Sequence, residues 1–273
     1  MNELESFVLI DVDHPGALDQ AYKARRNAIA EAANKYWREG GEGDLPLVDY
    51  SDEERDTWKK VSEILSDKLR ANAFADYLVA RDKMEIDWLE IPQMGKLSEL
   101  IKKASGWQLA PVAGLVNSRG FLGKLAEGKM LCTQYIRHHS KPEFTPEPDI
   151  IHEYIGHVPT FLNDEIVDIS RTIGRIALKA NEEQLKQLEL LYWFTLEFGL
   201  IEEKDKVKLF GAGTISSIGE QNKIFGGEVE WRPFELERVI NEKYDFTAMQ
   251  PYYYVVPSLA ELKKAVVKFS DRI

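Results

Sequence analysis

The stretch PDIIHEYIGHVP, residues 148–159, contains two of the five histidines of the chain, His152 and His157. Neutral imidazole is a common ligand for iron, zinc and copper, so this close pair suggests a metal site with a third ligand elsewhere in the sequence. The candidate is Glu197, which lies in the apolar and aromatic stretch LLYWFTLEFGL, residues 190–200. A carboxylate in such a stretch is expected to be buried, and a buried charge must be paired or must coordinate a metal.

The five-residue spacing of the histidines constrains the backbone between them. In an α-helix, residues five apart point about 140° away from each other, so a regular helix cannot direct both side chains to one point. Gly156 permits a helix-ending conformation and Pro159 stops continuation. We therefore expect His152 on a helix that begins near Asp149, with His157 beyond its broken end and turned back to the same point. The spacing also differs from the His-Glu-x-x-His motif of zinc proteases.

The residues alone leave other interpretations open. The two histidines could be hydrogen-bonded core residues, with Glu197 paired to an arginine. Two histidines and one carboxylate on one face of an octahedral ion leave three positions free, which favours non-haem Fe(II) and oxygen chemistry, although zinc is compatible with the same ligand types. Asp149 and Glu153 are competing carboxylate ligands, but Asp149 is also explained as a helix-start residue.

The composition predicts one soluble domain built mainly from helices. The chain has 273 residues, of which 44% are hydrophobic and 30% charged. An apolar stripe at helical spacing covers residues 17–38, and Ser51, Asn181 and Ser258, each followed three residues later by Glu or Gln, mark further helix starts. Strand-like patterns are short and cover residues 129–136 and 252–256.

Charge and cysteine content limit the partners and the compartment. The net charge of −11 argues against a nucleic-acid or anionic-membrane surface. The single Cys132 cannot form an internal disulfide, the N-terminus lacks the features of a signal peptide, and no apolar run approaches the roughly 20 residues of a membrane-spanning helix. We expect a cytoplasmic protein that binds neither nucleic acid nor membranes.

Several longer blocks of sequence resemble the pterin-dependent aromatic amino acid hydroxylases, in the same order and over nearly the whole chain. The blocks are DHPG (13–16), PVAGL (111–115), CTQYIRH (132–138), TPEPDIIHE (145–153), GHVP (156–159), YWFTLEFGL (192–200), GAG (211–213) and QP (250–251). The resemblance implies a single catalytic domain over residues 1–273, with a helical part at about 1–95 and the iron, pterin and substrate core at about 96–273. It also leads us to expect a monomer without the regulatory domain or tetramer-forming tail of animal relatives.

The resemblance implies a role for individual residues. His152, His157 and Glu197 would be the ligands of Fe(II), in agreement with the assignment from the residues themselves. Arg137 would bind the substrate carboxylate, a role that suits a planar guanidinium. The full set implied on the substrate side is Arg137, Thr145, Asp149, Trp193, Phe198, Ser216 and Glu220.

The pterin side of the site follows from the same resemblance. Phe121 would stack on the pterin ring, and the full set implied here is Gly114, Leu115, Ser118, Phe121, Glu153 and Tyr192. Two positions depart from the family pattern, because Gly120 stands where relatives often have an acidic residue and Leu131 where animal members have a histidine.

The activity that the resemblance implies is hydroxylation of the ring of an aromatic amino acid with Fe(II), a tetrahydropterin and O2, with phenylalanine converted to tyrosine. Trp193 favours phenylalanine over tryptophan, since the tryptophan branch has a smaller residue there. Phe246 stands where the tyrosine branch has an acid, although the adjacent Asp245 would restore it after a shift of one residue. The alternatives are a tryptophan hydroxylase of the same family, a zinc hydrolase with Glu153 as general base, and an amino-acid-binding protein without turnover.

Overall fold

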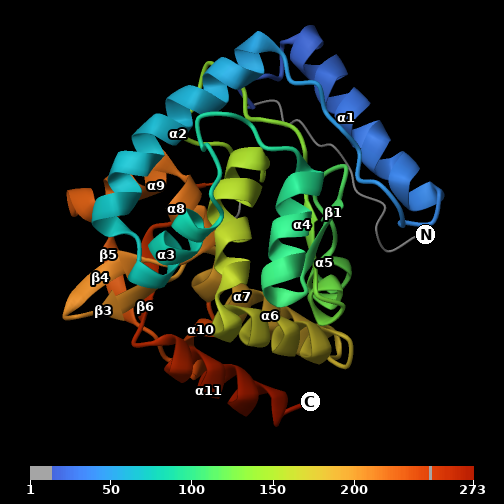
Figure 1. The fold of residues 1–273 in the computed structure, drawn as a ribbon. Coiled ribbons are helices and arrows are strands. Elements are labelled where there is room, and N and C mark those ends of the chain that lie inside the picture. Colours follow the sequence, from blue (N-terminus) through green and yellow to red (C-terminus); the bar gives the residue numbers. More distant parts are fainter. Residues whose placement is uncertain (1–13, 246–247) are drawn as a thin grey trace.

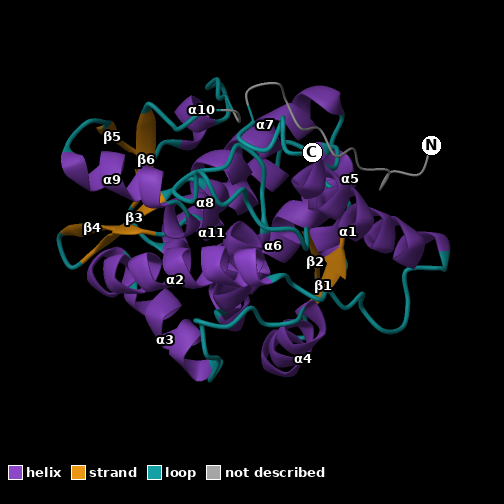
Figure 2. Cartoon of the chain, turned by 90° about the horizontal axis from the view of Figure 1, so that it is seen from above, coloured by secondary structure: helices purple, strands orange, loops and turns teal. Residues whose placement is uncertain are grey.

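The computed structural model describes residues 14–245 and 248–273 and shows a mainly helical chain (Figures 1 and 2). The α-helices are α1 (Gln20–Arg38), α2 (Asp52–Asn72), α3 (Ala75–Lys83), α4 (Met94–Ser105), α5 (Ser118–Ala126), α6 (Asp164–Ala177), α7 (Glu182–Tyr192), α8 (Ala212–Ser216), α9 (Ile218–Gly226), α10 (Leu236–Val239) and α11 (Leu259–Ser270). Three further helical turns, of π or 3-10 type, are η1 (Ile151–His157), η2 (Val158–Leu162) and η3 (Trp193–Glu197). No described helix combines the length and apolar character needed to cross a membrane.

The strands form two small sheets on opposite sides of the central helices (Figures 1 and 2). Strands β1 (Gln108–Pro111) and β2 (Lys129–Cys132) pair in parallel, and the second sheet has the order β4-β3-β6-β5, with β3 (Leu200–Glu203), β4 (Lys206–Leu209), β5 (Glu230–Pro233) and β6 (Tyr252–Val256). The mainly helical fold with a few short strands confirms the prediction from sequence.

The predicted helix starts are present as local hydrogen bonds. Ser51 and Asn181 each form a reciprocal capping box with the residue three positions later, and the Ser258 hydroxyl accepts from the Glu261 amide at 3.2 Å. These bonds satisfy amides that the first helical turn cannot pair internally.

The strand expected over residues 129–136 is shorter than predicted and ends at Cys132. The next amide, that of Thr133, donates to the Glu153 carboxylate at 3.1 Å instead of to a neighbouring strand. A side chain of the metal motif therefore ends the pairing of β2 with β1.

The backbone between the two histidines differs from our prediction, because no helix breaks at Gly156. Residues 151–157 form a π-helix, in which the Val158 amide donates to the Glu153 carbonyl five residues back. This wider winding places residues five apart nearly above one another, so His152 and His157 share one face without a break. Gly156 does not adopt a positive φ.

Close contact with α8 explains Gly156. A Cβ on this residue would lie 2.7 Å from the Ala212 carbonyl oxygen. Glycine therefore allows the π-helix to lie against the α8 backbone, and Pro159 occupies the first turn of η2, where its missing N–H costs nothing.

Gly174 fulfils a similar need where α6 crosses α5. A Cβ on Gly174 would lie 2.2 Å from the backbone nitrogen of Ala126. We expect Gly174→Ala to lower the free energy of unfolding by about 1–3 kcal/mol or more, because backbone atoms must move apart. Gly95→Ala in α4 is the matched control, since nothing lies within 4 Å of its Cβ position, and should leave stability unchanged or raise it by up to about 1 kcal/mol. Urea unfolding of both variants tests this, and equal effects would contradict it.

Candidate active site

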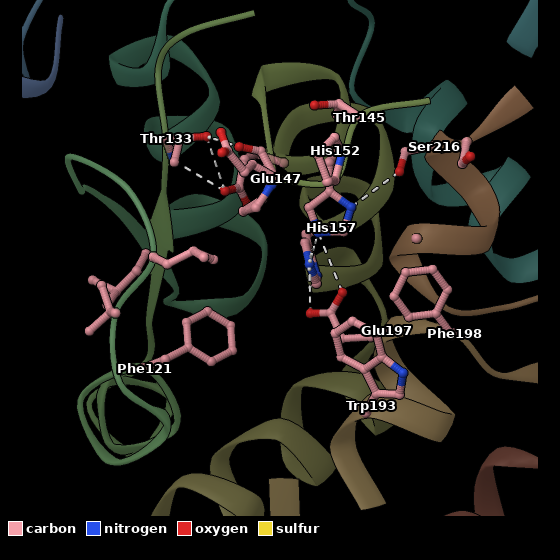
Figure 3. Close-up of a pocket in the computed structure, with 18 of the residues that line it drawn as sticks. Phe121, Thr133, Thr145, Glu147, His152, His157, Trp193, Glu197, Phe198 and Ser216 are labelled. Carbon is pink, nitrogen blue, oxygen red and sulfur yellow. Dashed lines mark hydrogen bonds and ion pairs between the residues drawn. The ribbon is translucent and has the colours of Figure 1, made fainter. Parts of the chain in front are cut away.

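His152, His157 and Glu197 converge on one point from two π-helical turns. His157 Nε2 lies 3.1 Å from His152 Nε2 and 3.1 Å from Glu197 Oε1, and His152 Nε2 lies 3.4 Å from Glu197 Oε2 (Figure 3). Glu197 ends η3, where the Phe198 amide donates to the Trp193 carbonyl five residues back. The sequence prediction that these three residues come together agrees with this geometry.

The triangle of donor atoms fits a metal ion. Ligands about 2.1 Å from an ion and at right angles to each other lie about 3 Å apart, close to the observed separations. Among the described residues, this is the one group of three or more His, Cys, Asp and Glu side chains whose ligand atoms come within 4.8 Å of one another. Asp149 and Glu153, the competing carboxylates, are not part of it.

The hydrogen bond behind His152 sets its tautomer. The Ser216 hydroxyl donates to the Ala212 carbonyl at 2.7 Å, so its oxygen is free to accept from His152 Nδ1, 3.2 Å away. Nδ1 then has the proton, and the lone pair of Nε2 faces the centre of the triangle. Such outer partners orient metal-binding imidazoles.

Three ionisable groups around the triangle have shifted pKa values. Burial favours the neutral form of Glu197, but the imidazoles of His157 and His152 outweigh it and hold its pKa well below the ordinary value. Burial also lowers the pKa of His152, yet the contact with Glu197 raises it overall. For Glu153 the effect of burial is larger than that of the two imidazoles, so the pKa of its carboxyl is raised. Glu197 is thus ionised, which is the state in which a carboxylate binds a metal ion.

The triangle opens onto a cavity of about 310 Å³ with aromatic walls. Phe121 lies on one side of the cavity, and Trp193 and Phe198 lie on the other, with the metal-type ligands between them (Figure 3). The Trp193 ring packs 4.6 Å from that of Phe198 and 4.3 Å from that of Tyr244. Two flat ligands could therefore bind on opposite sides of the point where His152, His157 and Glu197 converge.

Comparison with known proteins agrees with this arrangement. Residues 4–273 match the family model described as biopterin-dependent aromatic amino acid hydroxylase. The chain belongs to this family. It is 41% identical over 268 residues to rat phenylalanine-4-hydroxylase and 40% identical over 268 residues to mouse tyrosine 3-monooxygenase. Both alignments cover 97% of this chain but only 58% and 53% of those relatives, so the chain spans little more than half of their length.

Solved structures of bacterial hydroxylases share the fold over most of both chains. A Chromobacterium violaceum phenylalanine hydroxylase with bound iron(III) and 7,8-dihydrobiopterin superposes with a TM-score of 0.82 at 27% identity, covering 97% of this chain and 93% of that one. The phenylalanine hydroxylase of Legionella pneumophila has a TM-score of 0.77 at 31% identity, covering 83% of this chain and 92% of that one.

The hydroxylase fold brings nearly all the expected site residues to the cavity. Those that line it are Gly114, Leu115, Ser118, Phe121, Arg137, Thr145, His152, Glu153, His157, Tyr192, Trp193, Glu197, Phe198, Ser216 and Glu220. Asp149 does not line it. Phe246, on which part of the substrate expectation rests, lies outside the described residues.

Asp149 lies behind Arg137 and fixes its orientation. Its two carboxylate oxygens accept from Arg137 Nε at 2.9 Å and Nη2 at 2.8 Å, and one also accepts from the His152 amide at 3.1 Å. The last bond confirms Asp149 as a helix-start residue. Arg137 Nη1 donates to the Pro142 carbonyl at 3.1 Å, so two of the five guanidinium hydrogens remain for a ligand in the cavity.

Sequence reasoning missed several polar residues of the cavity. These are Thr133, Glu147, Ser217, Glu189 and Tyr244. The sequence did contain an indication of Glu189, because Glu189, Trp193 and Glu197 are four residues apart and so lie on one face of a helix. Tyr244 offered none, because its loop reaches the cavity only through tertiary packing.

The metal site leads to a direct prediction. We expect His157→Ala and Glu197→Gln to weaken Fe(II) binding by at least about 100-fold, since loss of an outer partner alone costs 10–100-fold. Anaerobic calorimetry measures the affinity, and circular dichroism confirms the fold. His139→Ala, a surface histidine paired with Glu53, is the control and should bind Fe(II) normally. Unchanged affinity in both site variants would show that the triangle is not the metal site.

Glu220 leads to a prediction about pH. It is buried, its carboxylate accepts from the Gln250 amide at 3.2 Å and from the Tyr253 hydroxyl, and burial raises its pKa to about 7. Between about pH 4.5 and 7, Glu220 is then protonated to a greater extent in the folded chain than in the unfolded chain. The free energy of unfolding therefore falls as the pH rises through this range.

We therefore expect the free energy of unfolding of Glu220→Gln, measured relative to that of the original protein, to be about 2 kcal/mol higher at pH 8 than at pH 5. Urea unfolding at both pH values gives the difference. Glu99→Gln, at an exposed position of α4, should show no such change. If the difference in the free energy of unfolding between Glu220→Gln and the original protein did not change with pH, the raised pKa of Glu220 would be refuted.

Proposed function

We propose that this chain is an Fe(II)- and tetrahydropterin-dependent monooxygenase that hydroxylates the ring of an aromatic amino acid, converting L-phenylalanine to L-tyrosine. The observation that supports it most is the triangle of the buried His157 and Glu197 with the partly buried His152, between two aromatic walls. A site with one carboxylate and two imidazoles leaves half of an octahedral ion open for reactants.

Family membership and the bacterial neighbours support the choice of metal and cofactor. The C. violaceum structure contains iron(III) and 7,8-dihydrobiopterin, and this chain offers two imidazoles and a carboxylate for a metal ion and the aromatic ring of Phe121 in the same cavity. When bound, Fe(II) and the tetrahydropterin supply the electrons and the centre that activate O2.

The residues of the chain bind and orient the reactants. Arg137, fixed by Asp149, presents its remaining N–H groups to the carboxylate of the amino acid, and Thr145 lines the same cavity. Trp193 and Phe198 then hold the substrate ring beside the metal ligands. The apolar and aromatic lining limits the access of water to the reacting atoms.

Phenylalanine is the proposed substrate because of the ring side of the cavity. The indole of Trp193 lies between Phe198 and the ring of Tyr244, which leaves less room for an indole substrate. Similarity does not separate phenylalanine from tyrosine as substrate, because the identities to rat phenylalanine-4-hydroxylase and mouse tyrosine 3-monooxygenase are 41% and 40%.

The test is anaerobic reconstitution with Fe(II), followed by addition of a tetrahydropterin, O2 and each aromatic amino acid in turn. We expect tyrosine as the product from phenylalanine, with a specificity constant above those for tyrosine and tryptophan, and no turnover without Fe(II). The Glu197→Gln variant is the control and should form no product. A higher specificity constant for tryptophan would reassign the substrate, whereas amide or ester hydrolysis with Zn²⁺ and no hydroxylation would overturn the monooxygenase.

A further inference from the structure

Glu189 is a cavity residue whose charge has no role in the functions assigned so far. It lies on α7, half-buried, and lines the same cavity as the metal-type ligands. One carboxylate oxygen accepts from the Ser118 hydroxyl at 2.6 Å, and the other accepts from the Tyr244 hydroxyl. No Lys, Arg or His of the described chain forms an ion pair with it.

The two hydrogen bonds fix the carboxylate without saturating it. A carboxylate can accept about four hydrogen bonds, and Ser118 and Tyr244 supply two. Both come from other elements, α5 and the segment before β6, so they hold the group in one orientation at the cavity wall. An acceptor that is fixed and unpaired with a cation favours a ligand with hydrogen-bond donors.

The position of Glu189 relative to Phe121 indicates which ligand it would meet. Ser118 and Phe121 are three residues apart on α5 and face the same side, so the partner of Glu189 is one helical turn from the expected pterin platform. Glu189 precedes the metal-type ligand Glu197 by about two helical turns, roughly 10 Å along the helix. Its hydrogen bond to Ser118 on α5 brings it to the pterin side of the cavity, at the part that is remote from the metal.

A second carboxylate marks the metal end of that side. Glu153 follows the ligand His152 directly and accepts from the Thr133 amide at 3.1 Å. Glu153 is therefore the carboxylate next to the metal ligands, and Glu189 is the one away from them, beside the helix that holds Phe121. The amino-acid end of the substrate is assigned to Arg137 and Thr145, on other elements, which leaves Glu189 for the cofactor.

We propose that Glu189 selects hydroxylated pterins by accepting hydrogen bonds from the hydroxyl groups of the side chain on the pterin ring. This inference rests on the proposed function. It predicts that the chain distinguishes tetrahydrobiopterin, whose side chain has hydroxyl groups, from 6-methyltetrahydropterin, which has none, and that the distinction depends on Glu189.

The test is anaerobic calorimetry of the Fe(II)-loaded protein with each of the two pterins. Glu189→Ala should raise the Kd for tetrahydrobiopterin about tenfold, as expected for loss of a hydrogen bond to a charged group, and should change the Kd for 6-methyltetrahydropterin by less than about twofold. Glu189→Gln, which keeps one acceptor oxygen, should lie between. Glu183→Ala, an exposed acid on the same helix, is the control for loss of charge and should bind both pterins normally.

Other results of this calorimetry would overturn either the role of Glu189 or the proposed function. An equal loss for both pterins would show that Glu189 only connects α7 to α5 and the Tyr244 segment, a role that Tyr244→Phe would share. Weaker binding of phenylalanine with both pterins unaffected would assign Glu189 to the substrate. If the original protein binds the two pterins equally, the selection is refuted while the proposed function stands, and if it binds neither, the proposed function fails as well.

Discussion

The close approach of two imidazole nitrogens and a carboxylate inside the protein is the constraint on which the rest of the site depends. Both segments that supply these groups, η1 and η3, wind as π-helices, and this winding brings His152 and His157 to the same face. A π-helix is an uncommon backbone state that needs support from its neighbours. Gly156 provides it for η1 by allowing contact with the Ala212 backbone, so the packing of α8 and the geometry of the metal-type ligands are determined together.

The polar residues around this centre are each fixed by a specific partner, and the partners come from different elements. Asp149 holds Arg137, and Thr133 holds Glu153 while ending strand β2. Buried charges without such partners would cost several kcal/mol each. The irregular segments of the fold, the short strand and the loop after it, therefore follow from the need to pair the side chains of the site.

The sequence predicted those parts that depend on local chemistry. The capping boxes at Ser51 and Asn181 need only residues three apart, and the ligand set needs only histidines in an unusual context. The path between His152 and His157 could not be predicted in the same way, because the choice between a broken helix and a π-helix is made by α8, far along the chain. Tyr244 reaches the cavity for a similar reason, through packing against Trp193 that no local pattern encodes.

The charges of the cavity lining restrict how a substrate can enter. Among the described lining residues the acids are Glu147, Glu153, Glu189, Glu197 and Glu220, whereas Arg137 is the one Lys or Arg. The Arg26 guanidinium pairs with Glu147, and Glu197 lies among the imidazoles, so a free amino acid finds one cationic group for its carboxylate and several acceptors elsewhere. An amino acid bound in the reverse direction, with its ring toward Arg137, would bring its carboxylate toward Glu197. Repulsion between like charges in a cavity of low dielectric disfavours that orientation. The proposed substrate would therefore place its ring against Trp193 and Phe198.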